Sequence, residues 1–375
     1  MQTYKRRLSV DQLKPGGTNN IFDFLPDVKD YFFTESVRGG LGELIRLLWT
    51  ENSSKVMLPV FVAEGVIRPF KDKNIPVIFY KLNADLSPDM IDIEEKLELN
   101  TDIRCMLVVH YFGFAQDLVP VKKICSTHSI ILLEDCVHGL FSKDENKNYL
   151  GTSGDISFFS LPKILPVPDG GIFFINNPRL IYLKSKIVYK KNLAGYLMVR
   201  FHLIYLLIKY FEVKLDYSIV YRLLNLFTKS IYYIYYFLLQ HSKKPQHISP
   251  FTLKILKNID YVSLITRRKE NIRIIYDTLS PASYLLLRNN YDADCMLTGV
   301  PVISKNCNKL VSFMRHHSIE CLSYKKSWFF MPEGKENEYI AENFFLQNHF
   351  LFPIHENNED YSKTLILLTK SGFLQ

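Results

Sequence analysis

Residues 160–171 read SLPKILPVPDGG and place one lysine, Lys163, beside an apolar run and a sharp turn. Lysine is seldom fully buried, so Lys163 either extends its ammonium to water or has a chemical use. A desolvated lysine has a lowered pKa, and its neutral amine can form a Schiff base with an aldehyde. A surface lysine on a loop is the common alternative, and Lys163 alone does not decide between the two.

Two acid–base residues precede Lys163 along the chain. Asp135 ends the apolar stretch SIILLED, where a buried carboxylate is costly unless it faces a positive charge such as a pyridinium nitrogen. Asp135 could instead cap the following helix. His138, three residues later, could contact substituents of a bound ring or fill a polar corner.

A candidate anion-binding turn lies near the N-terminus of the chain. The stretch SVRGGLGELI (36–45) places Gly39 and Gly40 at the start of an expected helix, where free N–H groups and the helix dipole favour a phosphate. Arg38 adds positive charge. Glycine turns into helices are common in proteins that bind no anion, so this motif gains weight only from its order before Asp135 and Lys163.

The elements that must position these residues alternate between short apolar strands and helices. Strands are expected at 56–62, 75–82, 105–113 and 129–135, and helices at 41–50, 89–99 and 118–128. This alternation indicates an α/β fold with a mostly parallel sheet covered on both faces. Ligands of such sheets bind beyond the carboxyl ends of the strands. We therefore expect HYFG (110–113), EDCVH (134–138) and SLPK (160–163) to meet in one pocket.

The remaining sequence changes in character after residue 176. The expected elements are two or three helices within 179–240, a long helix at 249–279, strands at 301–305 and 348–354, a helix at 306–317, and a turn at 357–362 before a final helix. The predicted division is a large α/β domain (1–176), a helical aromatic and basic insertion (177–247) and a small C-terminal domain (248–375).

The charge of the chain is regional. The net charge is +8, but residues 179–244 hold twelve Lys and Arg against Glu212 and Asp216, so the rest of the chain is close to neutral. Aromatic, basic helices at 195–240 could contact a membrane surface, form a dimer interface or pack as core. No nucleic-acid-binding module accompanies the charge, so no nucleic acid partner is expected.

The six cysteines have no CxxC pair and no histidine at metal-ligand spacing, so we expect neither a metal site nor a disulfide framework. The N-terminal stretch lacks the apolar core of a signal peptide, and no stretch of about 18 apolar residues predicts a membrane span. These features favour a cytoplasmic protein, with peripheral membrane contact as one role for 195–240.

Taken in order, the motifs resemble those of the DegT/DnrJ/EryC1/StrS sugar aminotransferases, which are pyridoxal-phosphate enzymes of the aspartate aminotransferase fold. The resemblance covers most of 30–176 and returns at 249–355. The matching motifs are SVRGGLGEL for the phosphate loop, VVHYFGFAQDL, ILLEDCVHGL for the EDxx(H/Q) motif, and GTSGDISFFSLPKILPVPDGG for the lysine-bearing stretch. Ala63 stands where many members have an aromatic residue that stacks on the cofactor ring, and Phe61 is the candidate substitute. The aromatic, basic segment replaces an Asn-containing loop of the family.

The resemblance implies a fold type I pyridoxal-phosphate transferase with a smaller C-terminal α/β domain. It implies that Lys163 binds the cofactor aldehyde and Asp135 its ring nitrogen, that His138 lies at the ring, and that Arg38, Gly39 and Ser160 hold the phosphate.

The activity that the resemblance implies is transfer of an amino group, from glutamate, to a keto sugar nucleotide in surface polysaccharide, lipopolysaccharide or glycolipid biosynthesis, carried out by a homodimer. Two other interpretations stay open. One is a catalytically inactive protein of this fold that serves as a binding or membrane-associated assembly module. The other is an enzyme that keeps the cofactor for dehydration, which retention of Lys163 disfavours.

Overall fold

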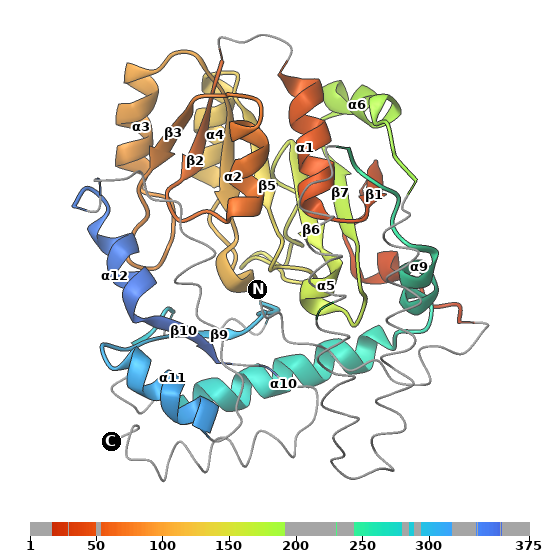
Figure 1. Cartoon of the computed structure of the whole chain (residues 1–375), viewed down its shortest axis with the longest axis vertical. Helices are drawn as coiled ribbons and strands as arrows, with labels where there is room; N and C mark the ends of the chain where they lie inside the picture. The colour runs from red at the N-terminus through yellow and green to blue at the C-terminus, as the bar shows by residue number, and fades with distance from the viewer. Residues whose placement is uncertain are drawn as a thin grey trace.

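The computed structural model describes residues 17–28, 30–49, 54–191, 230, 244–279, 285–288, 294–316, 335, 337–352 and 354. Figure 1 shows a large sheet with its helices in the upper part of the molecule, and a small sheet with two helices below it. Most of the segment 179–240, where two or three helices are expected, lies outside the described residues, as do the expected turn at 357–362 and the final helix after it. In the part of the chain that is described, no helix is long and apolar enough to cross a membrane.

The large sheet has seven strands in the order β1-β7-β6-β5-β4-β2-β3. Their bounds are β1 Tyr31–Thr34, β2 Lys55–Pro59, β3 Val77–Tyr80, β4 Ile103–Val109, β5 Ile131–Asp135, β6 Ile156–Ser160 and β7 Gly171–Ile175. Each neighbouring pair from β3 to β6 is parallel, whereas β7 is antiparallel to both β6 and β1. The expected α/β fold with a mostly parallel sheet is therefore confirmed.

Helices connect and cover the parallel strands, and α1 and α2 lie side by side in front of the sheet (Figure 1). The helices of this part are α1 Val37–Leu48, α2 Glu64–Lys71, α3 Met90–Leu99, α4 Val119–Thr127, α5 Leu161–Ile164 and α6 Tyr182–Lys186, with short 3-10 turns η2 Ile21–Phe24, η3 Tyr111–Gly113 and η4 Pro178–Leu180. Because helices occupy both faces, the central strands are buried on both sides and read as continuous apolar runs.

The first turn of α1 differs from the expectation. The helix begins at Val37, so Arg38, Gly39 and Gly40 lie inside its first turn rather than before it. The reason is the side chain of Ser36, which accepts a hydrogen bond from the N–H of Gly39 at 3.2 Å and so caps the helix.

The long helix expected at 249–279 is two helices, α9 Pro250–Leu256 and α10 Tyr261–Leu279. The break is stabilised by Asp260, whose carboxylate accepts from the N–H of Ser263, and by the hydroxyl of Tyr261, which donates to the carbonyl of Leu256. The region around α9 packs into the same apolar cluster as β6 and β7, so the core of the large sheet extends beyond residue 247. The division into three domains stays a prediction.

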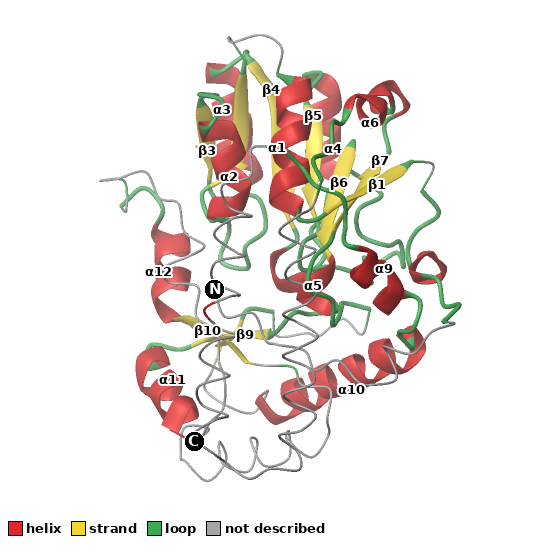
Figure 2. Ribbon diagram, turned by 45° about the vertical axis from the view of Figure 1, so that its right-hand side comes forward, coloured by secondary structure: helices red, strands yellow, loops and turns green. Residues whose placement is uncertain are grey.

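In its described residues, the small part contains a three-stranded antiparallel sheet and two helices. They are β8 Leu285–Leu286, β9 Val300–Ile303, β10 His349–Phe352, α11 Cys307–His316 and α12 Ile340–Asn348. The expected strands at 301–305 and 348–354 and the helix at 306–317 are confirmed. Figure 2 shows that α10 runs below the large sheet.

Candidate active site

The carboxyl ends of β4, β5 and β6 bring the three predicted strand-end motifs together. Val109 pairs with Asp135, and Asp135 pairs with Phe158, so the residues that follow these strands share one edge of the sheet. The amine of Lys163 lies 3.3 Å from Nε2 of His138. A Cβ on Gly113 would lie 2.8 Å from the carbonyl oxygen of His138. The expectation that 110–113, 134–138 and 160–163 meet is confirmed.

Lys163 is held by a short helix directly after β6. The N–H of Leu161 donates to the carbonyl of Gly170 at 3.0 Å, and the N–H of Leu165 donates back to Leu161 at 2.8 Å. Lys163 is partly exposed as a whole residue, but burial disfavours the charged form of its amine. This desolvation lowers the pKa of Lys163 to about 8, against the opposing effect of the Asp135 charge.

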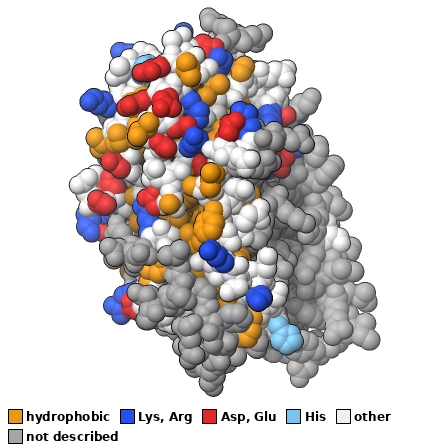
Figure 3. All heavy atoms as spheres, turned by 90° about the vertical axis from the view of Figure 1, so that its left-hand side faces the viewer, with side chains coloured by type: hydrophobic (Ala, Val, Ile, Leu, Met, Phe, Trp, Pro, Cys, Tyr) orange, Lys and Arg blue, Asp and Glu red, His pale blue; other side chains and the backbone are white. Residues whose placement is uncertain are grey.

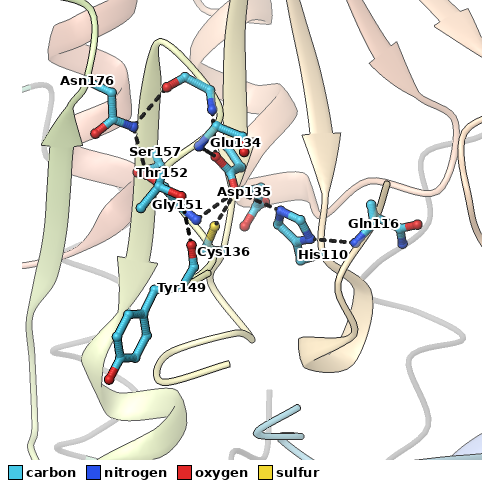
Figure 4. Close-up of polar contacts among 12 residues, drawn as sticks. His110, Gln116, Glu134, Asp135, Cys136, Tyr149, Gly151, Thr152, Ser157 and Asn176 are labelled. Atoms are coloured by element: carbon cyan, nitrogen blue, oxygen red, sulfur yellow. Dashed lines mark hydrogen bonds and ion pairs between the residues drawn. The ribbon is translucent and has the colours of Figure 1, made fainter. Parts of the chain in front are cut away.

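The two consecutive carboxylates that end β5 have opposite surroundings. Glu134 accepts hydrogen bonds from the N–H groups of Gly151, Ser153 and Gly154 at 2.6, 3.1 and 2.7 Å, as Figure 4 shows in part. His110 adds a further contact at 2.9 Å. Burial by itself would raise the pKa of Glu134, but these bonds hold the pKa below its ordinary value. Glu134 is therefore a structural anion that anchors the loop before β6.

The protonation of His110 follows from its two partners. Its Nδ1 accepts from the N–H of Gln116 at 3.0 Å, so Nε2 carries the proton and donates to Glu134 (Figure 4). Cys136 also points its thiol at Glu134, at 3.6 Å. His110, Glu134 and Cys136 are thus close enough to hold a metal ion, but the carboxylate oxygens already have several donors each. The hydrogen bonds to Glu134 are enough to explain why these three side chains lie together, without a metal ion.

The carboxylate of Asp135 accepts fewer hydrogen bonds than that of Glu134. Among the described residues, the Asp135 carboxylate accepts a hydrogen bond from the N–H of Val137 at 3.0 Å. Burial raises the pKa of Asp135 to about 6, while Val137, His110 and Lys163 lower it. A buried carboxyl group with this little support favours a cationic neighbour. The surroundings of Asp135 therefore fit a protonated ring nitrogen, and Asp135 is near enough to Lys163 for the two charges to interact.

His138 is buried, and burial together with the charge of Lys163 lowers its pKa well below the ordinary value. A neutral imidazole can either donate to or accept from the amine of Lys163. The ring of Phe112 lies parallel to that of His138, with an interplanar angle of 5° and centroids 6.0 Å apart. Phe112 has φ 60°, a left-handed conformation that is uncommon for a bulky residue. Phe112 was not among the residues singled out from sequence.

The first turn of α1 lies beside the lysine-bearing segment. Ser160 pairs with Gly171, and a Cβ on Gly171 would lie 2.8 Å from the backbone nitrogen of Val37. Ser160 and the start of α1 are therefore neighbours, as a shared phosphate site requires.

Two predicted phosphate residues behave differently from the expectation. The N–H of Gly39 donates to the Ser36 hydroxyl and is not left free. The guanidinium of Arg38 extends to α2, where a Cβ on Gly65 would lie 2.9 Å from its Nη2. The candidate stacking residue Phe61 is fully buried, and its ring packs against Tyr111 and Phe345, at 5.4 and 5.5 Å between centroids.

A buried acid next to α1 was missed from sequence. Glu35 accepts from the hydroxyl of Ser36 at 3.1 Å and from the N–H of Gln246 at 2.6 Å. Burial raises the pKa of Glu35 to about 7, and the nearby Asp169 adds to this effect. A Cβ on Gly39 would lie 2.3 Å from Oε1 of Glu35, which explains a glycine at that position. The sequence feature that could have pointed to Glu35 is its position directly before Ser36, the serine that caps α1.

The α/β fold of this chain is similar to that of solved pyridoxal-phosphate-dependent aminotransferases. The model of the DegT/DnrJ/EryC1/StrS aminotransferase family matches residues 72–189 of this chain. That range contains the segments that carry Asp135, His138, Ser160 and Lys163.

Among curated relatives, the chain is 25% identical over 130 residues to a GDP-perosamine synthase of Vibrio cholerae, a match that covers 34% of this chain and 35% of that protein. It is 28% identical over 102 residues to an L-glutamine:2-deoxy-scyllo-inosose aminotransferase of Streptomyces kanamyceticus, covering 26% of this chain and 24% of that protein. The matches thus span about a third or less of these relatives.

Solved structures resemble the whole chain. PseC of Helicobacter pylori, an aminotransferase of pseudoaminic acid biosynthesis, matches with a TM-score of 0.69 and 15% identity over 99% of this chain and 98% of that one. The PLP form of the sugar aminotransferase Spr1654 of Streptococcus pneumoniae matches with a TM-score of 0.70 and 13% identity over 100% and 99%. At such identities the likeness concerns the fold.

Proposed function

We propose that this protein is a pyridoxal-phosphate-dependent aminotransferase that acts on a keto sugar nucleotide. The observation that carries the proposal is the contact of 3.3 Å between the amine of Lys163 and His138, beside the buried acid of Asp135 on the neighbouring strand. The family match over residues 72–189 and the GDP-perosamine synthase among the similar proteins support the same activity.

The residues present would hold the cofactor at three points. Lys163 would bind its aldehyde, Asp135 its ring nitrogen, and Ser160 with the first turn of α1 its phosphate. His138 would lie at the ring between Lys163 and Asp135. When bound, pyridoxal phosphate supplies an aldehyde that takes up amines and a protonated ring that withdraws electrons from the adjacent carbon. Arg38 and Gly39 belong to the same proposal, with a smaller share of the phosphate contacts, because the N–H of Gly39 donates to Ser36 and the guanidinium of Arg38 extends toward α2.

The amine of Lys163 is suited to carry a proton. With a pKa of about 8, roughly a tenth of it is neutral at pH 7, compared with well under a thousandth of an ordinary lysine. As a neutral amine, Nζ can take a proton from the α-carbon of an amino donor, and as an ammonium it can return that proton to another carbon. His138 restricts where Nζ lies. Asp135, once it faces a cation, stays ionised at neutral pH.

The finer features belong to the same proposal. The donor is glutamate, the acceptor is a sugar nucleotide with a ring keto group, and the product serves surface polysaccharide, lipopolysaccharide or glycolipid biosynthesis. The enzyme works as a homodimer in the cytoplasm. The inactive-module interpretation is not favoured, because the chain keeps Lys163 and Asp135 and brings them to one edge of the sheet.

Absorption spectroscopy tests the cofactor. Purified protein mixed with pyridoxal phosphate should turn yellow, and Lys163→Ala should lose that colour, whereas Lys122→Ala on the exposed face of α4 should keep it. Glutamate should bleach the band, and a keto sugar nucleotide from a panel should restore it while forming an amino sugar. A wild-type protein that stays colourless, or that keeps its band when glutamate is added, would contradict the proposal.

A further inference from the structure

Glu35 lies at the same edge of the large sheet as Lys163. Because β7 is antiparallel to both β1 and β6, these two strands run in the same direction, and the residues that follow them share one edge. Thr34 and Ser160 both pair with Gly171, one from each side. Glu35 therefore follows β1 two strands away from the segment that carries Lys163, although the proposed function gives it no role.

The carboxyl group of Glu35 lies against the first turn of α1. Its Oε1 leaves no room for a Cβ on Gly39 and accepts from the hydroxyl of Ser36, the capping residue, at 3.1 Å. Its Oε2 accepts from the N–H of Gln246 at 2.6 Å. The residue is 1% exposed. A buried acid is thus located at the helix end where the proposed function places the cofactor phosphate.

The surroundings of Glu35 favour its protonated form. Burial raises the pKa of Glu35 to about 7, and the charge of the buried Asp169 adds to this effect, while the hydrogen bonds from Gln246 and Ser36 oppose it. About half of the Glu35 side chains are therefore charged at pH 7. A second anion nearby would add repulsion, because two like charges that share a site do not both ionise readily.

Other titratable and charged groups around Glu35 come from three further segments. Tyr189, after α6, has its pKa raised to about 12 by burial and by the charge of Glu35, so it is neutral near pH 7. His247 is exposed and stacks on Tyr189, with 4.1 Å between the ring centroids. Arg38 belongs to the same turn of α1, and its guanidinium extends toward Gly65 of α2. Glu35 can respond to an anion at this turn by taking up a proton.

We propose that Glu35 takes up a proton from solvent when the phosphate group of the cofactor binds at the start of α1. The carboxylate becomes a neutral carboxylic acid, which removes its repulsion with the phosphate dianion. Ser36 and Gln246 keep their hydrogen bonds, because a hydroxyl group can accept as well as donate. Glu35 thereby sets the pH range in which the cofactor binds tightly. The inference rests on the proposed function, which places the phosphate between Ser160 and α1.

Calorimetric titration of the full chain with pyridoxal phosphate, at about pH 6 and about pH 8, tests the inference. The neutral fraction of Glu35 falls from about nine tenths to about a tenth over this range, so wild-type affinity should weaken about tenfold relative to that of Glu35→Gln. Glutamine imitates the protonated acid, because its amide can accept from Gln246 and donate to Ser36. Titration of Lys163, Asp135 and the phosphate itself is common to both proteins and cancels in the ratio.

Two controls separate the phosphate from other effects. Pyridoxal has the aldehyde and the ring but no phosphate, so its ratio of wild-type to Glu35→Gln affinity should not change with pH. Glu94→Gln removes an exposed acid from α3 and should bind pyridoxal phosphate as the wild type does. Acidic and basic side chains are intermixed on the face with α3 (Figure 3), and exposed charges there are screened from a distant anion.

A second measurement uses the unaltered chain. Calorimetry at about pH 8 in two buffers of different ionisation enthalpy gives the number of protons taken up on binding. Uptake with pyridoxal phosphate should exceed uptake with pyridoxal by about 0.9 proton, because about nine tenths of Glu35 is charged at that pH and the phosphate is already a dianion.

Three results would overturn the inference. Equal proton uptake with the two ligands, or an affinity ratio that is the same at both pH values, would show that Glu35 keeps its charge state, while the proposed function stands. A pyridoxal ratio that changes as much as the pyridoxal phosphate ratio would show that Glu35 acts on the fold or on the amine of Lys163. Binding of neither ligand by any of the proteins would refute the proposed function and the inference together.

Discussion

Asp135→Asn tests the electrostatic pairing on which the candidate site depends. Burial lowers the pKa of Lys163 to about 8, and the charge of Asp135 opposes that effect. Removing the charge leaves burial unopposed, so the pKa of Lys163 should fall further. A nearby opposite charge changes a pKa by about 1–3, and the lower end applies here because the effect of Asp135 is smaller than that of burial. We expect the pKa of Lys163 to fall by about one, to about 7.

The assay follows the neutral amine directly, before any cofactor is added. Reductive methylation by formaldehyde requires the unprotonated amine, so its rate at Lys163, read by mass spectrometry of the peptide, reports the fraction that is neutral. A fall of the pKa from about 8 to about 7 raises this fraction at pH 7 from about a tenth to about a half. The rate in Asp135→Asn should therefore rise about fivefold at pH 7 and change little above about pH 9.

The matched control is Asp72→Asn, which removes an exposed acid at the end of α2 and should leave the pH profile of Lys163 unchanged. If Asp135→Asn leaves the midpoint where it is, or raises it, the carboxylate does not act on Lys163. The two groups could then not serve one planar ring, and the proposed function would lose its main support.

Three further predictions concern stability. Glu134→Gln should lower the free energy of unfolding in urea by about 2–4 kcal/mol, because an amide cannot accept on both arms; an unchanged midpoint would refute the anchoring role. Glu35 has a pKa of about 7 in the fold against 4.5 in the unfolded chain, so its stabilising contribution is present below pH 4.5 and is lost as the pH rises through 7. Glu35→Gln should therefore raise the urea midpoint at pH 8 but not at pH 4, and equal changes would contradict this. Gly171→Ala should destabilise by about 1–3 kcal/mol, since its Cβ would meet Val37, whereas Gly42→Ala, with open space around it, should stabilise by up to about 1 kcal/mol.

The sequence by itself determined the order of the elements and the residues that end the central strands. Strands buried on both faces must be continuous apolar runs, so β4 and β5 are visible as such in the sequence. Parallel strands end at one edge, so a carboxylate after one run and a lysine after the next had to meet. These conclusions depend on short-range periodicity and on a general rule of sheet geometry, which is why Asp135 and Lys163 could be predicted.

The tertiary structure decided what each polar side chain faces. Glu134 and Asp135 are adjacent in sequence, but successive side chains of a strand point to opposite faces, so one is fully hydrogen-bonded and the other is not. The environment of Glu35 depends on Gln246, 211 residues away. The guanidinium of Arg38 extends toward Gly65 of α2, a neighbour that the sequence around Arg38 does not indicate. Packing between segments that are distant in the sequence determines such partners. The residue types alone do not predict which segments pack together.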